Sequence, residues 1–250
     1  MPPLFYGRRV ADMSLFGYSV DQNVALITMT SGENRFNPVF LDAFLGILDT
    51  IETETDARAI VVRSAHEKIF SNGIDLEWLV PVIGRGDIET AKAFFFSLNR
   101  VFARLLTYPL LTVAAINGHA FAGGAIISCA FDFRFMQTGR GFFCLPEVDL
   151  GIPFLPGMNE LLNKAIPTYK LEEMQYTGAR LTAEACETHH IITRACPPET
   201  LVADTLAFAK GLNKNRPVIA ELKRRLNRHI IRAMEVDDRP YIESGQFHIA

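Results

Sequence analysis

The sequence predicts an α/β fold organised around one main hydrophobic core, and three observations indicate this. Short apolar runs typical of buried strands alternate with longer segments of helical periodicity over the first two thirds of the chain. The segments between successive strands are long enough for helical crossovers, which favours parallel strands in right-handed βα units. The length of 250 residues is close to the largest that a single core organises.

Turn signals and periodicity predict the individual elements. Two alternating runs, YSVDQ and VALITMT, flank a turn at Asp21, Gln22 and Asn23, and predict an opening β-hairpin. Pro38 begins a helix that is expected to reach about residue 54, and a second helix is expected over residues 88–106. Buried strands are predicted in AIVVRS, LTVAAI and DFRFMQ, and a glycine-rich turn followed by a short apolar helix in NGHAFAGGAIISCAF. We expect AHEKIFSNGIDLEWL to be a loop.

From about residue 157 the periodicity is almost wholly helical, without a clear linker. The segment PVIAELKRRLNRHIIRAM is predicted to be one amphipathic helix that docks on another surface. Its apolar face contains Ile219, Leu222, Leu226, Ile230 and Met234. Its opposite, solvated face contains Lys223, Arg224, Arg225, Arg228 and Arg232.

Composition and charge narrow the class of protein. The net charge is −3 and the basic residues are scattered before residue 223, so no basic surface for nucleic acid is expected. No secretory leader is recognised, and no apolar run has the roughly eighteen residues that a membrane span requires. The cysteines form no C-x-x-C pair, so we expect reduced, mostly buried thiols at Cys129, Cys144, Cys186 and Cys196. We therefore expect a bacterial cytoplasmic protein or, in a eukaryote, a peroxisomal or mitochondrial matrix protein.

Two loops place glycine directly after a buried strand, at the entrance to a helix. In FSNGIDL, Gly73 allows a tight turn that can leave the N–H of Ile74 outside any strand ladder. In HAFAGG, Gly123 and Gly124 begin a helix, where N–H groups lack intrahelical acceptors and favour negative charge. Together the loops suit an oxyanion hole, although turn chemistry alone explains either one.

The segment LPEVDLGIPF surrounds Glu147 with apolar residues. A carboxyl group in such surroundings has a raised pKa unless it is paired, which suits a general acid or base. Taken by itself, the segment is more simply interpreted as a loop with a surface glutamate, because perturbed carboxyl groups mark sites only statistically.

The succession KIFSNGIDL, INGHAFAGGAIISCAFDFRF, LPEVDLGIPFLPG and TGARLTAEAC resembles the crotonase superfamily of enoyl-CoA hydratases and isomerases, over roughly residues 18–230. SNGIDL and PEVDLGIP are especially similar to monofunctional Δ3,Δ2-enoyl-CoA isomerases. The resemblance implies a crotonase-like ββα spiral core in residues 1–195 and a C-terminal helical oligomerisation segment in residues 196–250. It also implies that the N–H groups of Ile74 and Gly123 form the oxyanion hole and that Glu147 is the acid and base.

Departures from the family pattern favour one reaction. Hydratases of the family have a second glutamate where this chain has Ile126, and dienoyl-CoA isomerases have an aspartate where it has Leu155. One carboxyl group among Ile126, Phe154 and Leu155 suits proton transfer within a substrate better than the positioning of water. The resemblance therefore implies conversion of a 3-enoyl-CoA to the 2-trans-enoyl-CoA through a dienolate, in fatty acid β-oxidation.

Other interpretations of the same fold stay open. The chain is alternatively a hydratase, or an enzyme of another enolate reaction such as thioester hydrolysis or decarboxylation. A non-enzymatic alternative is a protein that binds acyl-CoA or RNA.

The resemblance also implies binding residues and partners. The loop with Arg35 and Phe36 is expected near the CoA nucleotide, with Arg35 on a phosphate or simply solvated. The helix with Phe94, Phe95, Phe96 and Phe102 is expected to line the acyl tunnel or, more simply, to pack in the core. The remaining substrate-binding candidates are Ser71, Asn72, Gly73, Asp75, Leu76, Gly124, Ile126, Phe154 and Leu155.

Coenzyme A enters as part of the substrate thioester, so neither a separate cofactor nor a metal is expected, and His189 and His190 are predicted to be structural or exposed. A homotrimer, or a hexamer built as a dimer of trimers, is expected through the C-terminal helices. No membrane or nucleic-acid partner is expected.

Overall fold

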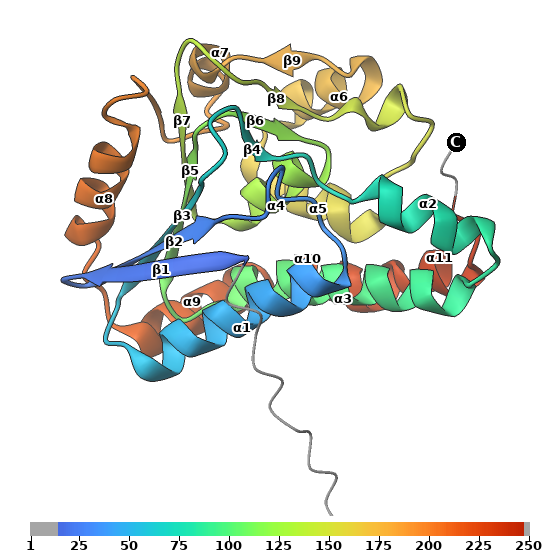
Figure 1. The fold of residues 1–250 in the computed structure, drawn as a ribbon, viewed down its shortest axis with the longest axis horizontal. Coiled ribbons are helices and arrows are strands. Elements are labelled where there is room, and N and C mark those ends of the chain that lie inside the picture. The colour runs from blue at the N-terminus through green and yellow to red at the C-terminus, as the bar shows by residue number, and fades with distance from the viewer. Residues whose placement is uncertain (1–14, 248–250) are drawn as a thin grey trace, which may run out of the picture.

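Within residues 15–247, which the computed structural model describes, the strands form a six-stranded sheet and a smaller four-stranded sheet beside it (Figure 1). The large sheet has the order β1-β2-β3-β5-β7-β10 and the small sheet the order β4-β6-β8-β9. The large sheet contains β1 Phe16–Asp21, β2 Val24–Met29, β3 Ala59–Ser64, β5 Leu111–Ile116, β7 Phe133–Gln137 and β10 Arg194–Cys196. The small sheet contains β4 Ile69–Ser71, β6 His119–Phe121, β8 Phe143–Cys144 and β9 Arg180–Leu181.

The predicted opening hairpin is confirmed. β1 and β2 pair antiparallel, and Gln22 turns the chain with φ of +55°. The other neighbours in the large sheet run parallel, as their helical crossovers predicted. The helix predicted from Pro38 is α1 (Pro38–Glu54), and the Asn37 side chain caps it by accepting the Phe40 N–H at 3.0 Å.

The chain winds as a spiral that alternates between the two sheets. β3 is followed by β4, β5 by β6 and β7 by β8, and each pair leads into helix. These helices are α2 (Leu76–Gly84) with α3 (Ile88–Thr107), then α4 (Gly123–Ala130), then α5 (Pro156–Ala165). The α/β class and the ββα spiral expected from the sequence are both confirmed.

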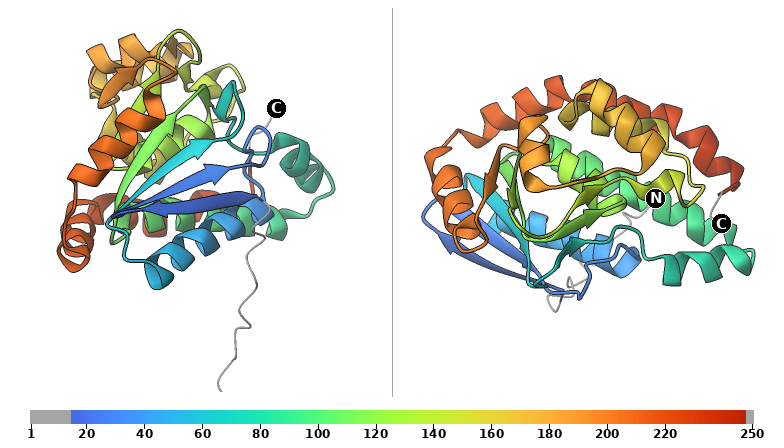
Figure 2. Two further views of the ribbon diagram at one scale, coloured as in Figure 1. Left: turned by 60° about the vertical axis from the view of Figure 1, so that its left-hand side comes forward. Right: turned by 90° about the horizontal axis from the view of Figure 1, so that it is seen from above.

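Helices cover both faces of the large sheet (Figure 2). Alternate residues of β3 pack against the helices on opposite faces. Ile60 and Val62 belong to the larger core cluster, together with residues of α1, α3 and α4. Val61 faces the opposite way, into a smaller cluster with Leu201 and Ala209 of α8 (Leu201–Gly211). The cavity described below lies on the side of the larger core.

Several short elements differ from the sequence prediction. β4 and α2 occupy the segment expected to be a loop, and β6 lies in the expected glycine-rich turn. Strands of two or three residues are too short for periodicity to reveal, and α2 contains Pro81, which reads as a helix breaker. The region after residue 157 contains the strands β9 and β10 besides α6 (Thr168–Thr177) and α7 (Ala183–Thr188). The division of the chain at residue 195 stays a prediction, and β10 spans it.

The segment predicted as one amphipathic helix, residues 217–234, is divided among three elements. These are α9 (Arg216–Leu226), α10 (Arg228–Arg232) and the start of the π-helical η2 (Ala233–Asp237), and α11 (Arg239–Ser244) follows them. The division occurs at Asn227, which is buried and whose Nδ2 donates to the Leu106 carbonyl at 2.8 Å.

The prediction of one helix with a single buried apolar face was wrong, because the helix is interrupted and only part of the predicted face is buried. Ile230 and Met234 are buried, whereas Leu222 is 58% and Leu226 72% exposed. Lys223, assigned to the solvated face, is only 6% exposed. The oligomerisation role of this segment stays a prediction, which the exposed leucines of α9 suit.

The buried Lys223 is neutralised by Asp132, and the pair permits a stability prediction. The Lys223 ammonium lies 2.8 Å from Asp132 Oδ2, and the two side chains are 7% and 14% exposed. We expect Asp132→Asn to lower the free energy of unfolding by about 3 kcal/mol, because it leaves a buried charge unpaired. Asp21→Asn, which breaks the exposed Lys210–Asp21 pair, should cost at most about 1 kcal/mol. Urea unfolding measures both, and equal losses would contradict the prediction.

Three expectations from composition concern the described residues. The four cysteines are buried and unpaired, as predicted. Across residues 15–247, no helix has the length and apolarity needed to cross a bilayer. The same part of the chain has no cluster of three or more side chains suited to a metal ion, and His189 instead lies 2.9 Å from the Tyr169 hydroxyl.

Candidate active site

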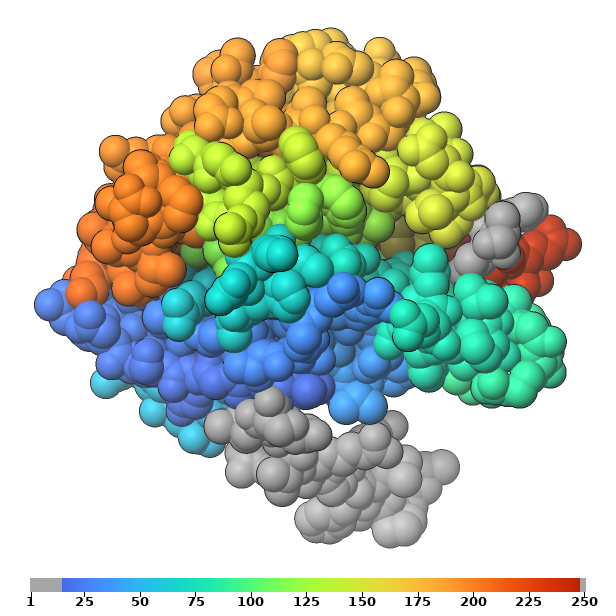
Figure 3. Space-filling view, turned by 45° about the horizontal axis from the view of Figure 1, so that its top comes forward, coloured from blue at the N-terminus to red at the C-terminus, as the bar shows by residue number. Residues whose placement is uncertain are grey.

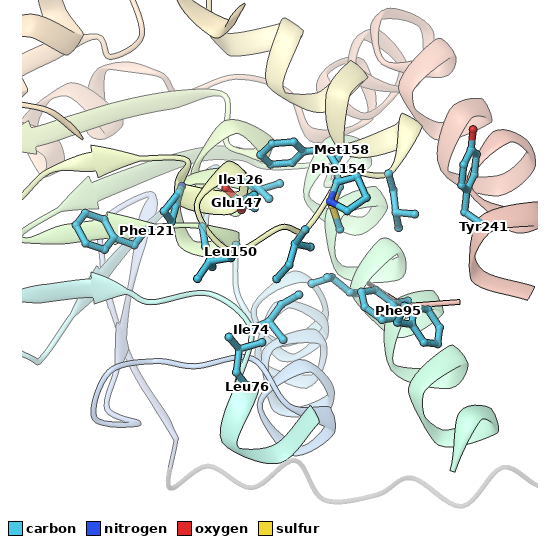
Figure 4. A pocket seen from close by; sticks show the side chains of 18 of the residues that line it. Ile74, Leu76, Phe95, Phe121, Ile126, Glu147, Leu150, Phe154, Met158 and Tyr241 are labelled. Carbon is cyan, nitrogen blue, oxygen red and sulfur yellow. The ribbon is translucent and has the colours of Figure 1, made fainter. Parts of the chain in front are cut away.

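A cavity of about 550 Å³ lies where α2, α3, the segment after β8 and α11 converge. These elements are far apart in sequence, but Figure 3 shows teal α2, the yellow-green segment after β8 and red α11 approaching one another at one end of the molecule. The lining is mostly apolar, and it includes Ile74, Gly123 and Glu147. The three residues expected to be catalytic therefore share one cavity, and Figure 4 labels Ile74 and Glu147.

The two glycine loops are in direct backbone contact. A Cβ added at Gly73 would lie 2.4 Å from the Gly123 nitrogen, and Gly73 has φ of +73°. A Cβ added at Gly124 would lie 2.1 Å from the Ser71 carbonyl oxygen. Real side chains do not fit at such separations, so glycine is required at both positions. This close approach places the Ile74 and Gly123 amides beside each other, since a Cβ at Gly123 would lie 3.3 Å from the Ile74 nitrogen.

Hydrogen bonds on either side of Ile74 hold its loop and leave its own N–H available. The Phe36 N–H donates to the Gly73 carbonyl at 2.7 Å, and the Asp75 N–H donates to the Phe36 carbonyl at 2.9 Å. In the part of the chain that the structure describes, neither the Ile74 N–H nor the Gly123 N–H donates to a backbone carbonyl. Two such N–H groups in one cavity are suited to bind an anion.

Ala122, the residue before Gly123, adopts an unusual backbone conformation. It precedes α4 with φ of +50° and ψ of −124°, a region that residues with a side chain rarely adopt. The Ala122 N–H is held by the Cys144 carbonyl at 3.0 Å. Nothing in the sequence signals this conformation, because the residue is not glycine.

The opposite end of α4 is held by two cations, the buried Arg134 and the partly buried Lys164. Arg134 donates to the Ser128 and Phe131 carbonyls at 3.3 and 2.9 Å. Lys164 donates to the Cys129 carbonyl at 3.2 Å, and burial lowers its pKa to about 8. Positive charge at a helix C-terminus complements the helix dipole, so these contacts stabilise the helix that presents Gly123.

Glu147 lies in the short 3-10 turn η1 (Pro146–Val148) and is 6% exposed. The Glu147 carbonyl accepts the N–H groups of Leu150 and Ile152 at 3.1 and 3.0 Å, which fixes the turn. Within the described residues its Oε2 has no hydrogen-bond partner. Burial raises the pKa of this carboxyl group to about 7. The apolar surroundings read from the sequence therefore produce the expected shift.

Glu147 is the only carboxylate among the described residues that line the cavity. Ile126 and Leu155, the positions at which the resemblance would place a second acidic residue, line the same cavity and are apolar. The cavity lining also includes Phe154, Asn72 and Leu76. Asn72 Nδ2 donates to Glu33 Oε2 at 3.0 Å.

Other expected binding residues lie behind the cavity wall and support it. Ser71 Oγ donates to the Asn34 carbonyl at 2.7 Å and accepts the Gly73 N–H at 3.1 Å. Asp75 caps α2 by accepting the Trp78 N–H. Phe36 is buried, and a Cβ on Gly123 would lie 3.2 Å from its ring. These residues, like Gly73 and Gly124, position the two loops without lining the cavity.

Arg35 is paired within its own loop and with α2. Its guanidinium lies 2.7 Å from Glu33 and 2.7 Å from Glu77, and these hydrogen bonds raise its pKa. Its contact with a CoA phosphate stays a prediction. In that contact the phosphate would replace Glu33 or Glu77 as the partner of the guanidinium.

The aromatic helix α3 divides between cavity and core. Phe95 and Phe102 line the cavity, whereas Phe94 is buried against Trp78 with ring centroids 5.1 Å apart. Sequence reasoning missed the lining residues from the end of the chain, which are Tyr241, Ser244, Gln246 and Phe247. No motif marks them, because only the tertiary fold brings α11 to α3.

Comparison with known proteins identifies the family of the chain. The family model described as enoyl-CoA hydratase/isomerase matches residues 19–244. The chain belongs to the enoyl-CoA hydratase/isomerase family. The sequence is 28% identical over 218 residues to enoyl-CoA delta isomerase 3 of Arabidopsis thaliana, covering 84% of this chain and 91% of that protein. It is 30% identical over 207 residues to a putative enoyl-CoA hydratase of Thermus thermophilus, covering 82% and 80%.

Solved structures of the family share the fold. An enoyl-CoA hydratase/isomerase family protein from Pseudomonas syringae superimposes with a TM-score of 0.84 at 21% identity, over 95% of this chain and 99% of that one. The crotonase fold implied by the sequence motifs is thereby confirmed. Relatives named for isomerisation and for hydration are similarly related to this chain, so the choice of reaction rests on the residues of the cavity.

Proposed function

We propose that this family member is a Δ3,Δ2-enoyl-CoA isomerase, which converts 3-enoyl-CoA to 2-trans-enoyl-CoA in fatty acid β-oxidation. The observation that carries the proposal is the single carboxylate, Glu147, among the described residues of an otherwise apolar cavity. Hydration requires polar groups that hold a water molecule, and Ile126 and Leu155 supply none. The similarity to relatives named enoyl-CoA delta isomerase supports the same reaction.

The proposed oxyanion hole accounts for stabilisation of the intermediate. The thioester carbonyl oxygen of the substrate accepts hydrogen bonds from the N–H groups of Ile74 and Gly123. Loss of a proton from C2 places negative charge on this oxygen, where the two preorganised donors and the N-terminus of α4 stabilise it.

Glu147 accounts for the proton transfers. Its carboxylate removes a proton from C2, and the electron pair delocalises into a dienolate that includes the original C3–C4 double bond. The protonated Glu147 then returns the proton to C4, which leaves the double bond between C2 and C3. A pKa of about 7 suits both steps, because neither protonation state is strongly favoured at neutral pH.

Two substrates given separately test the proposed reaction. We expect 3-hexenoyl-CoA to be converted to the conjugated thioester at least about 100-fold faster than crotonyl-CoA is hydrated, because no second acid or base holds water. The absorbance of the conjugated thioester rises in the first assay and falls in the second. Comparable rates would instead support a hydratase, and binding of both thioesters without turnover would support an acyl-CoA-binding protein.

A further inference from the structure

The end of the chain forms a wall of the cavity that no motif describes. Gly245 ends α11 with φ of +67°, and the turn brings Gln246 and Phe247 to the cavity. A Cβ at Gly245 would lie 2.6 Å from the Ile88 side chain, so this turn is packed against the start of α3. The last described residues are therefore part of the cavity wall.

Phe247 closes this wall by stacking on Phe95 of α3. The ring centroids are 4.7 Å apart and the planes are inclined by 20°. Phe95 is 9% exposed and makes an edge contact with Phe94 at 5.4 Å, while Phe247 is half-buried. Phe95 is thus held by its contact with Phe94, and the more exposed Phe247 is the more easily displaced member of the pair.

Asp238 ties this wall to the rest of the cavity. It is fully buried, and it accepts the Gly157 N–H at 2.7 Å and the Asn99 side-chain amide at 2.8 Å. Gly157 belongs to α5 and Asn99 to α3, and both helices line the cavity through Met158 and Leu98. The start of α11 is therefore tied to two helices that line the cavity.

The aromatic pair lies at the side of the cavity away from the carboxylate. Figure 4 shows Phe154 and Met158 between Glu147 and the side occupied by Phe95 and Tyr241. The lining in this direction is apolar, with Phe154, Leu155 and Met158 among its residues. A substrate that reacts at Glu147 and extends this way must present hydrocarbon to these walls.

We propose, resting on the proposed isomerase function, that the Phe95–Phe247 pair is the stop against which the methyl end of the fatty acyl chain abuts, so that it sets the maximum acyl length. Chains that end before the pair gain binding with each methylene, by up to about 4-fold per methylene in affinity. Chains that reach the pair gain no more, because further length must displace the Phe247 ring.

Saturated acyl-CoAs of increasing length test the stop without requiring turnover. Dissociation constants measured by calorimetry, from six to sixteen carbons, should fall with length and then level off or rise for the unsubstituted protein. Phe247→Ala should move this break to longer chains by two or more carbons, and Phe95→Ala should move it in the same direction. The kcat/KM profile for 3-enoyl-CoAs should shift in parallel.

Phe208→Ala is the matched control, because Phe208 is also half-buried and also contacts a ring, Phe133 at 4.9 Å, but on α8. It should leave the break unchanged. A break that stays in place in Phe247→Ala and Phe95→Ala would overturn the stop. Shifted dissociation constants without isomerisation of any 3-enoyl-CoA would reject the proposed reaction but retain the stop.

Discussion

Glu147→Gln is expected to lower kcat for 3-hexenoyl-CoA by about 1,000-fold or more, because one carboxyl group both removes and returns the proton. KM should change little, since glutamine keeps the shape of the side chain and the acyl walls are intact. In the unsubstituted enzyme kcat/KM should rise with pH through about 7, the pKa of Glu147, and then level off as the base becomes fully ionised. Initial rates between pH 5 and 9 measure both effects. Near-normal turnover by the variant would reject Glu147 as the acid and base.

Protein stability supplies the control for this variant. The pKa of Glu147 is raised from 4.5 to about 7 in the folded protein, so folding favours its protonated form. Its contribution to stability is fully present below pH 4.5 and is lost as the pH rises through 7, by about 3 kcal/mol in all. Glutamine does not ionise, so we expect Glu147→Gln to match the unsubstituted protein at pH 4.5 and to be more stable at pH 8. Urea unfolding at the two pH values measures the difference, and a variant that is unfolded at the pH of the activity assay would trace the loss of activity to unfolding.

Gly73→Ala is expected to lower kcat/KM by about 100-fold or more, as expected for loss of an oxyanion donor. The new Cβ would lie 2.4 Å from the Gly123 nitrogen, so the two loops must separate and both donor N–H groups must move. The positive φ of Gly73 adds a backbone cost of about 1–2 kcal/mol to the loss of folding stability. Steady-state kinetics and thermal unfolding separate the two effects.

Gly139→Ala is matched to this substitution in backbone geometry. Gly139 has φ of +72°, but no atom lies within 4 Å of the Cβ that would be added. The free energy of unfolding of Gly139→Ala should therefore fall by a similar amount, about 1–2 kcal/mol, while the variant keeps its activity. Full activity in both variants would show that turnover does not depend on the close approach of the loops.

The sequence by itself determined the elements whose signals are local. The hairpin at Gln22, the helix from Pro38 and the long strands all follow from turn residues, caps and periodicity, which act within a few residues. The family resemblance of the two glycine loops and the Glu147 segment also predicted that Ile74, Gly123 and Glu147 lie together, and they line one cavity. The glycine motifs are informative because only glycine fits at positions 73 and 124, where a Cβ would clash with the other loop.

Only the tertiary structure decided the features that depend on contacts between distant segments. The break at Asn227, whose side chain donates to the Leu106 carbonyl, is one such feature, and the exposure of Leu226 and the burial of Lys223 against Asp132 are others. The strained conformation of Ala122 and the pairing of Phe247 with Phe95 likewise have no local signal. Periodicity indicates which face of an element is apolar. Whether that face is buried, and whether it contributes to the cavity wall, depends on the packing of the whole chain.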